Sequence, residues 1–192
     1  MHAIGNKIIG GFELLFLFGR GIRKFTGTRQ EAVQSIAAPV LAYGAGFFIG
    51  DLYPPKGMEQ GYGTAQIIGT MTAHFLLSFV LASLLVAALA RQFGRGGQFL
   101  LYFSASNWTA VPLFIINLPL LILAERGIAP RATMDQVFTI MALYTYAVTG
   151  CIAYSALRVN WMLAGFIAIA VMFVNQELWH ILYLIQGIPI PW

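Results

Sequence analysis

Charged side chains are scarce in this 192-residue chain, where Asp, Glu, Lys and Arg together make up 9% of the residues. Soluble domains carry roughly a quarter. Hydrophobic residues make up 59%, and the mean hydropathy is +0.76. These values exclude a water-soluble fold. The net charge of +4 does not indicate nucleic-acid binding, because the basic residues are scattered at the ends of apolar stretches rather than gathered with aromatic side chains.

Cysteine and the motifs of soluble enzymes are also lacking. The one cysteine, Cys151, can form neither an internal disulfide nor a metal framework. The sequence contains no Walker loop, no H-E-x-x-H, no G-x-S-x-G and no paired-cysteine spacing. The interhelical segments expected over 51–63 and 125–135 are too short for a catalytic domain. We therefore expect no enzymatic activity, no catalytic residue, no bound metal and no cofactor.

Long apolar stretches are abundant, and five of them approach the roughly 20 residues needed to cross a bilayer. Thr28 and Glu31 have the spacing of a capping box at the start of the first stretch. Residues 1–192 are thus predicted to form one all-α domain, a polytopic bundle of about five transmembrane helices. The expected spans cover residues 31–49, 64–90, 98–124, 136–157 and 161–186.

The segment before the first span, residues 1–27, is predicted to be an interfacial amphipathic helix. Its apolar stretch is too short to cross the membrane, while Ile4, Ile8, Phe12 and Leu15 recur at helical spacing. A cleaved signal peptide is disfavoured because Glu13 interrupts the stretch and basic residues follow it where small residues would be needed.

The distribution of basic residues predicts the orientation. Alternating the loops across five spans puts eight of the 11 basic residues on one side and three on the other. The positive-inside rule then places the N-terminus in the cytoplasm and the C-terminus outside. The larger group is Lys7, Arg20, Arg23, Lys24, Arg29, Arg91, Arg95 and Arg158, and the smaller is Lys56, Arg126 and Arg131.

Small residues recur every four positions along the first expected span, at Ala38, Ala42, Gly46 and Gly50. Because helices in lipid associate through close backbone approach, this ridge predicts a tightly packed neighbour. The neighbour is either another helix of the same bundle, the interpretation we favour, or a second copy of the chain.

The third expected span combines polar and helix-breaking residues, with Asn107, Pro112, Asn117 and Pro119 as its main members. The two prolines would leave the carbonyls of Trp108 and Ile115 without an amide partner, which predicts kinks. Side chains such as Asn107 and Thr109 are candidate replacement donors. Structural satisfaction of a kinked helix and a solute-binding site both remain open here.

Three ionisable side chains lie well inside the expected spans, namely His74, Glu177 and His180, and such groups indicate function by default. His74 and Glu177 fall at similar depth, and Glu177 and His180 share a helix face. We therefore consider one polar cluster. Its alternatives are structural Glu177–His74 pairing, a functional site such as a proton relay, metal site or haem ligand pair, and an interface with a partner.

Several short segments resemble the small Yip1-like membrane proteins of alphaproteobacteria. They are the amphipathic N-terminal segment, Ser-Ile-Ala-Ala-Pro at 35–39, Tyr-Phe-Ser-Ala-Ser-Asn-Trp-Thr-Ala-Val at 102–111, and Tyr-Ser-Ala-Leu at 154–157. The resemblance implies a five-span membrane protein with a cytoplasmic N-terminus. It implies no chemistry, since the long cytoplasmic regions of eukaryotic relatives are lacking.

Two functional hypotheses follow. The first is a non-enzymatic inner-membrane protein that acts as an accessory, scaffold or assembly component of a membrane complex or lipid environment, with membrane lipids and a membrane protein as partners. The alternative is a small transporter or channel subunit that uses the polar residues within the spans.

Overall fold

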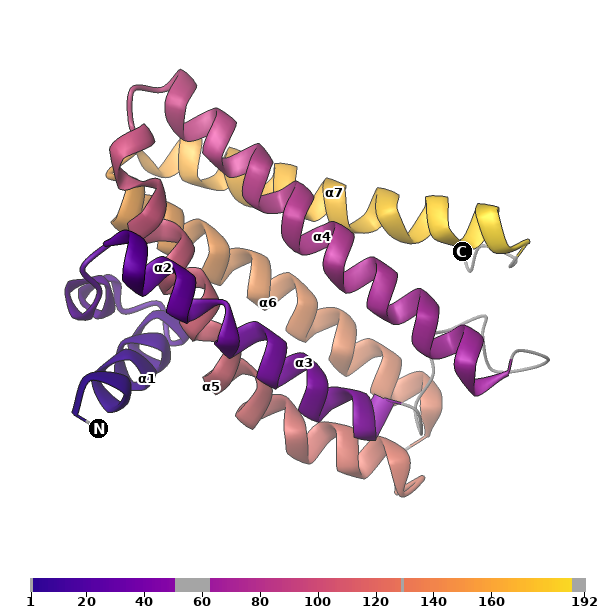
Figure 1. Ribbon diagram of the computed structural model, residues 1–192. Helices are drawn as coiled ribbons and strands as arrows, with labels where there is room; N and C mark the ends of the chain where they lie inside the picture. The colour runs from indigo at the N-terminus through magenta and orange to yellow at the C-terminus, as the bar shows by residue number, and fades with distance from the viewer. Residues whose placement is uncertain (1, 51–62, 129, 188–192) are drawn as a thin grey trace.

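The structure, a computed structural model, describes residues 2–50, 63–128 and 130–187, and this part of the chain contains helices and no strand. Four helices have the length and apolar composition needed to cross a membrane. They are α4 (Thr64–Gln92), α5 (Phe99–Glu125), α6 (Arg131–Leu157) and α7 (Trp161–Gln186), and they run alongside one another (Figure 1). The all-α fold is therefore confirmed, and it is compatible with a multi-pass membrane protein.

The ends of these four helices lie close to the boundaries expected from hydropathy, with one exception. α6 begins at Arg131 rather than at 136, because the carbonyl of Pro130 accepts hydrogen bonds from the amides of Thr133 and Met134, at 3.0 and 3.1 Å. Proline is favourable at the start of a helix, where no amide donor is needed.

The first expected span, residues 31–49, is instead divided into α2 (Arg29–Ser35) and α3 (Ala37–Gly50), with the break at Ile36. Pro39 explains the break: it has no amide for the carbonyl of Ser35, and its ring crowds that carbonyl. Neither helix is long enough to count as a membrane-crossing helix by itself. The described chain thus has four candidate spans, and the fifth is not confirmed.

The N-terminal segment forms α1 (His2–Leu15), followed by a 3₁₀ helix, η1 (Gly19–Lys24). We expected α1 to lie on the membrane surface, but one of its faces packs against α5 and η1. Leu14 and Leu15 are completely buried there, and the Tyr144 hydroxyl of α6 donates to the Leu15 carbonyl at 2.5 Å. α1 is therefore part of the folded bundle.

Glycine makes this close docking feasible. A Cβ atom on Gly11 would lie 2.8 Å from the carbonyl oxygen of Trp108, and a Cβ on Gly21 would lie 2.6 Å from the carbonyl oxygen of Gly10. The Trp108 carbonyl is the one that Pro112 deprives of its helical amide. The backbone of α1 thus covers α5 at the proline.

The core joins α1, α4, α5, α6 and α7, with Leu14, Val86, Tyr102, Ile152 and Ile167 among its buried members. α4 packs mainly along α7 and has little contact with α5. The connections between α4 and α5 and between α6 and α7 lie at the end of the bundle where α1 lies (Figure 1).

Candidate intramembrane site

His74 on α4 faces α7. Its Nε2 atom is 3.1 Å from the backbone carbonyl oxygen of Asn175 and 3.3 Å from the Ser78 hydroxyl. Since a carbonyl can only accept, the contact with Asn175 requires a proton on Nε2. The imidazole also stacks on the indole of Trp179, with ring centroids 4.0 Å apart and planes at 15°. His74 therefore contributes to the α4–α7 contact.

A cavity of about 380 Å³ lies beside His74, bordered by α3, α4 and α7. On the α3 side, the Tyr43 ring stacks on Phe75 with centroids 4.2 Å apart, and its hydroxyl is 3.1 Å from the hydroxyl of Thr72. The full lining is Tyr43, Met71, His74, Phe75, Ser78, Phe79, Ala82, Asn175 and Trp179.

A second cavity, of about 120 Å³, adjoins the first along α4, and Phe79 and Ala82 line both. It reaches between α4, α5 and α6, and polar side chains form much of its wall: Ser83, Tyr102, Ser106, Asn107 and Thr149. The first cavity is mostly apolar and open at its outer side, so the polar wall is confined to the second cavity, beside the first third of α5. Polar cavities inside a membrane bundle are typical of binding sites and solute pathways.

Glu177 and His180 do not join His74. The His180 Nδ1 atom is 3.7 Å from a carboxylate oxygen of Glu177, and the two side chains are 46% and 61% exposed, respectively. Asn175 and Trp179 share the face of α7 that contacts α4, whereas Glu177 lies about 200° around the helix from Asn175. The Glu177–His74 pairing, one of the alternatives considered from the sequence, is not formed in this structure, and the three residues form two separate sites.

Asn107 lies in α5 beside the break between α2 and α3. Its amide donates to the hydroxyl of Ser35 at 2.9 Å, and that hydroxyl donates to the Ala32 carbonyl at 2.7 Å. Thr109 donates to the carbonyl of Ala105, at 2.8 Å. Neither of these two candidate donors bonds the carbonyl of Trp108.

Pro112, Asn117 and Pro119 were also singled out from the sequence, and all three lie within α5. This helix runs through both prolines without a break. Two buried polar atoms on α5 lack a hydrogen-bond partner among the described residues: the Ser104 hydroxyl and the side-chain oxygen of Asn117.

The ridge of small residues on α3 is tightly packed over only part of its described length. Ala38 is buried, Ala42 is half-buried, and α3 packs against α5. Both alanines border a groove rather than a closed helix–helix contact. Gly46 and Gly50 belong to α3, but their surroundings lie outside the described part of the structure.

A buried ion pair that the sequence analysis missed joins α1 to α2. The Lys7 ammonium contacts one carboxylate oxygen of Glu31 and donates to the Lys24 carbonyl at 2.5 Å. The other carboxylate oxygen accepts from the amides of Thr26 and Gly27 at 2.6 and 2.8 Å. One signal was present: Lys7 lies on the same helix face as Ile4 and Gly11.

Half of the expected capping box is present at the start of α2, since the Thr28 hydroxyl accepts from the Glu31 amide at 3.3 Å. The Glu31 carboxylate accepts from the amides of Thr26 and Gly27 rather than from that of Thr28. Burial alone would raise the pKa of the Glu31 carboxyl. Lys7 and the donors of Thr26 and Gly27 outweigh this effect and hold the pKa below its ordinary value. Glu31 is therefore an ionised, structural carboxylate.

The fold and the two sites define a class of protein rather than a family. The class is an all-helical protein with four membrane-compatible helices, one polar site around His74 and a second at Glu177 and His180. No family model, no curated protein and no solved structure matches the chain. Within the part of the chain that the structure describes, no three His, Cys, Asp or Glu side chains are placed to hold a metal ion.

Proposed function

We propose that the chain is a non-enzymatic accessory or assembly component of a complex in the bacterial cytoplasmic membrane, and that it crosses the bilayer five times. The fifth crossing is built from the last residues of α2 together with α3, and it begins after Glu31. α3 runs beside α5 from the end where α1 lies toward the opposite end (Figure 1). Residues 33–50 would extend about 27 Å as helix, close to the roughly 30 Å of a hydrocarbon core.

The basic residues support an orientation with the N-terminus in the cytoplasm. With five crossings, the segments containing α1, η1 and the α4–α5 and α6–α7 connections share one side. That side carries eight of the 11 basic residues, and cytoplasmic loops are enriched in Lys and Arg.

The proposal of a partner rests on Glu177 and His180, the pair of side chains that faces outward from α7. Glu177 lies nine residues before the end of α7 at Gln186, which is about 13 Å along the helix and within the hydrocarbon. Its side chain points away from the bundle, between the exposed side chains of Phe173 and Ile181. A charged side chain at that depth costs about 2.5–3.5 kcal/mol on insertion scales, and such residues normally face protein or water.

The partner that fits this face is a membrane-spanning helix of another protein with a hydrogen-bond donor or a cationic side chain at the depth of Glu177. Such a helix would pair the carboxylate and remove it from lipid. The apolar residues around the pair would supply the packing surface. This arrangement makes the chain a subunit or assembly factor without assigning it any chemistry of its own.

Site-specific photocrosslinking in membranes tests the partner. A crosslinker at Ile181 should yield an adduct with a membrane-spanning peptide of another protein, and the yield should fall in the Glu177→Leu/His180→Leu variant. A crosslinker at Leu76, which is similarly exposed on α4, should give no such adduct. Adducts with lipid alone, or with a second copy of the chain, would contradict the accessory role.

The two adjoining cavities favour a second candidate, a small transporter or channel subunit. His74 and Asn175 line the first cavity and Asn107 lines the second. A proton flux in liposomes containing an entrapped pH dye, reduced by His74→Phe, would support it. A flux no greater than that of protein-free liposomes would remove proton conduction from consideration.

A further inference from the structure

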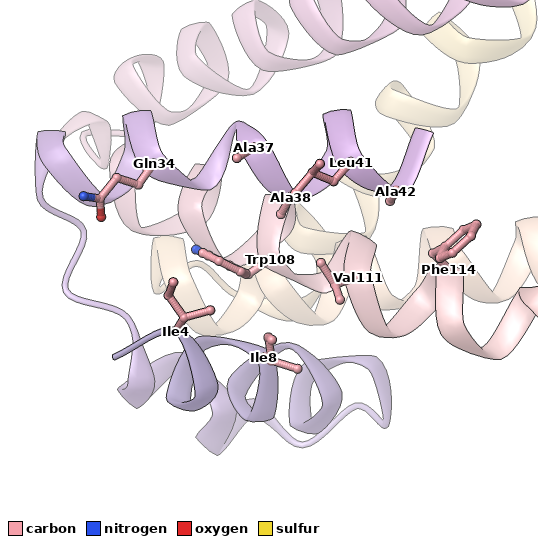
Figure 2. A pocket seen from close by; sticks show the side chains of 10 residues that line it. All are labelled: Ile4, Ile8, Gln34, Ala37, Ala38, Leu41, Ala42, Trp108, Val111 and Phe114. Atoms are coloured by element: carbon pink, nitrogen blue, oxygen red, sulfur yellow. The ribbon is translucent and has the colours of Figure 1, made fainter. Parts of the chain in front are cut away.

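A groove of about 790 Å³ lies between α1, α3 and α5, at the end of the bundle where the chain begins. Figure 2 shows Ile4 and Ile8 of α1 on one side and Ala37 to Ala42 of α3 on the other, with Trp108 between them. The volume falls within the range of about 300–1,000 Å³ that is typical of small-molecule sites.

The groove is apolar along most of its length and polar at one end. Gln34 lies at that end, and the indole nitrogen of Trp108 points toward it, whereas Phe114 lies at the opposite end (Figure 2). All other lining residues are Ala, Val, Leu, Ile or Phe. This gradient suits a ligand with a polar head and a long hydrocarbon chain.

The groove opens toward the surroundings of the bundle rather than into its interior. Leu41 on one rim is 70% exposed and Ile4 on the other is 57% exposed. In a membrane, side chains this apolar and this exposed lie against acyl chains. The small side chains of Ala37, Ala38 and Ala42 leave the space between the rims open.

The polar end of the groove follows a basic segment of the chain, because Gln34 lies on α2, which begins at Arg29. Residues 1–31 contain five basic and two acidic side chains. Both acidic residues are paired, Glu31 with Lys7 and Glu13 with Arg20. The other basic side chains, Arg23, Lys24 and Arg29, have no acidic partner among the described residues. An excess of positive charge at a membrane surface attracts anionic headgroups.

We propose that this groove binds one acyl chain of an anionic membrane phospholipid, with the headgroup at the Gln34 end. The chain would fill the space between α1 and α3 and rest on Trp108 and Val111. This site is independent of the outer face of α7, because it lies on different helices.

Quenching of tryptophan fluorescence by brominated acyl chains tests the proposal on the full-length protein in bilayers. Brominated phosphatidylglycerol, diluted in phosphatidylcholine, should quench at least twofold more than the same fraction of brominated phosphatidylcholine. The difference should disappear in Trp108→Phe, which assigns the signal to the groove. It should also disappear in Ala42→Phe, whose ring would fill the groove, and persist in Ala88→Phe, a matched change at an exposed position on α4.

A second measurement covers variants that fold poorly. After detergent extraction and washing, native mass spectrometry should find one phosphatidylglycerol per wild-type chain and per Ala88→Phe chain. Equal quenching by the two lipids, or quenching and retained lipid that Ala42→Phe leaves unchanged, would overturn the proposal. These lipid measurements concern the groove alone, and crosslinking at Ile181 tests the proposed function separately. Failure of the lipid proposal can therefore be distinguished from failure of the proposed function.

Discussion

His74 and Glu177 lie in facing spans at similar depth, and the direction in which each points gives them different roles. His74 stacks on Trp179 and bonds the backbone of Asn175, so it holds α4 to α7. Glu177 contacts only His180 among polar partners in the described chain. The first residue therefore serves the fold, and the second is free to serve a partner.

Substitutions at these two positions should separate fold from assembly. His74→Ala should lower the stability of the purified protein by about 1–3 kcal/mol, because it removes an aromatic stack and a hydrogen bond. Glu177→Gln should leave stability unchanged, because the side chain bonds nothing else in the bundle. Denaturant unfolding in micelles measures both. A strong loss of stability in Glu177→Gln would contradict the outward orientation of this residue.

Gly11 has no side chain, and this allows the backbone of α1 to approach α5 closely. Gly11→Ala places a methyl group 2.8 Å from the Trp108 carbonyl oxygen, and relief of this clash should cost about 1–3 kcal/mol. Gly5→Ala is the matched control: nothing lies within 4 Å of its Cβ position, so the better helix former should stabilise α1 by about 0.5–1 kcal/mol. Unfolding midpoints in detergent compare the two. Equal effects would show that α1 is not docked on α5.

The connection between α1 and α2 depends on ionised Glu31. Because its pKa is lowered on folding, its contribution to stability is present above the unfolded value near 4.5 and is lost as pH falls through the folded value. Glu31→Gln should lower stability at neutral pH by about 1–3 kcal/mol. It should also flatten the acid limb of the profile of stability against pH.

A matched change checks that this effect comes from burial. The Glu13–Arg20 pair is longer, at 3.5 Å, and the Arg20 side chain is 70% exposed. Glu13→Gln should therefore change stability by less than about 1 kcal/mol. An unaltered acid limb in Glu31→Gln would show that other groups govern acid unfolding.

The helices could be predicted from the sequence to different degrees. α4, α5 and α7 were located within two residues, since long apolar stretches and their end signals are local properties. The break at Ile36 was missed because Pro39 lies within an apolar stretch, and composition alone does not reveal that it separates Ser35 from the helix that follows. The Glu177–His74 pairing, one of the alternatives considered from the sequence, is not formed. Similar depth suggested it, but the rotation of α7 directs Asn175 and Trp179 toward His74 instead.

The pattern of α1 places Lys7 on the face of Ile4 and Gly11, but it does not identify Glu31 as the partner of Lys7. The buried pair depends on α1 and α2 meeting at one end of the bundle, which is a tertiary property. The same holds for the bond between Thr70 on α4 and Gln186 at the end of α7, where the hydroxyl donates at 2.8 Å. Both contacts join residues that look unremarkable in the sequence.

At the scale of the whole molecule, topology is the property to measure first. Reporter fusions should place the N-terminus and the segment 91–97 in the cytoplasm and the C-terminal residue Trp192 outside, because five crossings put the ends on opposite sides. Activity of an alkaline phosphatase reporter at the C-terminus, together with a fluorescent reporter at the N-terminus, gives this result directly. A cytoplasmic C-terminus would leave four crossings, with α2 and α3 bent back along the surface.

The docking of Gly11 on Trp108 has a consequence for the order of events during synthesis. α1 leaves the ribosome about 100 residues before its binding surface on α5 exists, an interval of roughly 5–20 s. Chains stalled at residue 100 should leave a Leu14→Cys thiol reactive, and full-length chains with Cys151→Ala should protect it. During that interval the amphipathic face of α1 can rest on the bilayer. Binding of α1 to the membrane surface would therefore be confined to the unfinished chain, whereas its contacts with α5 form only in the finished one.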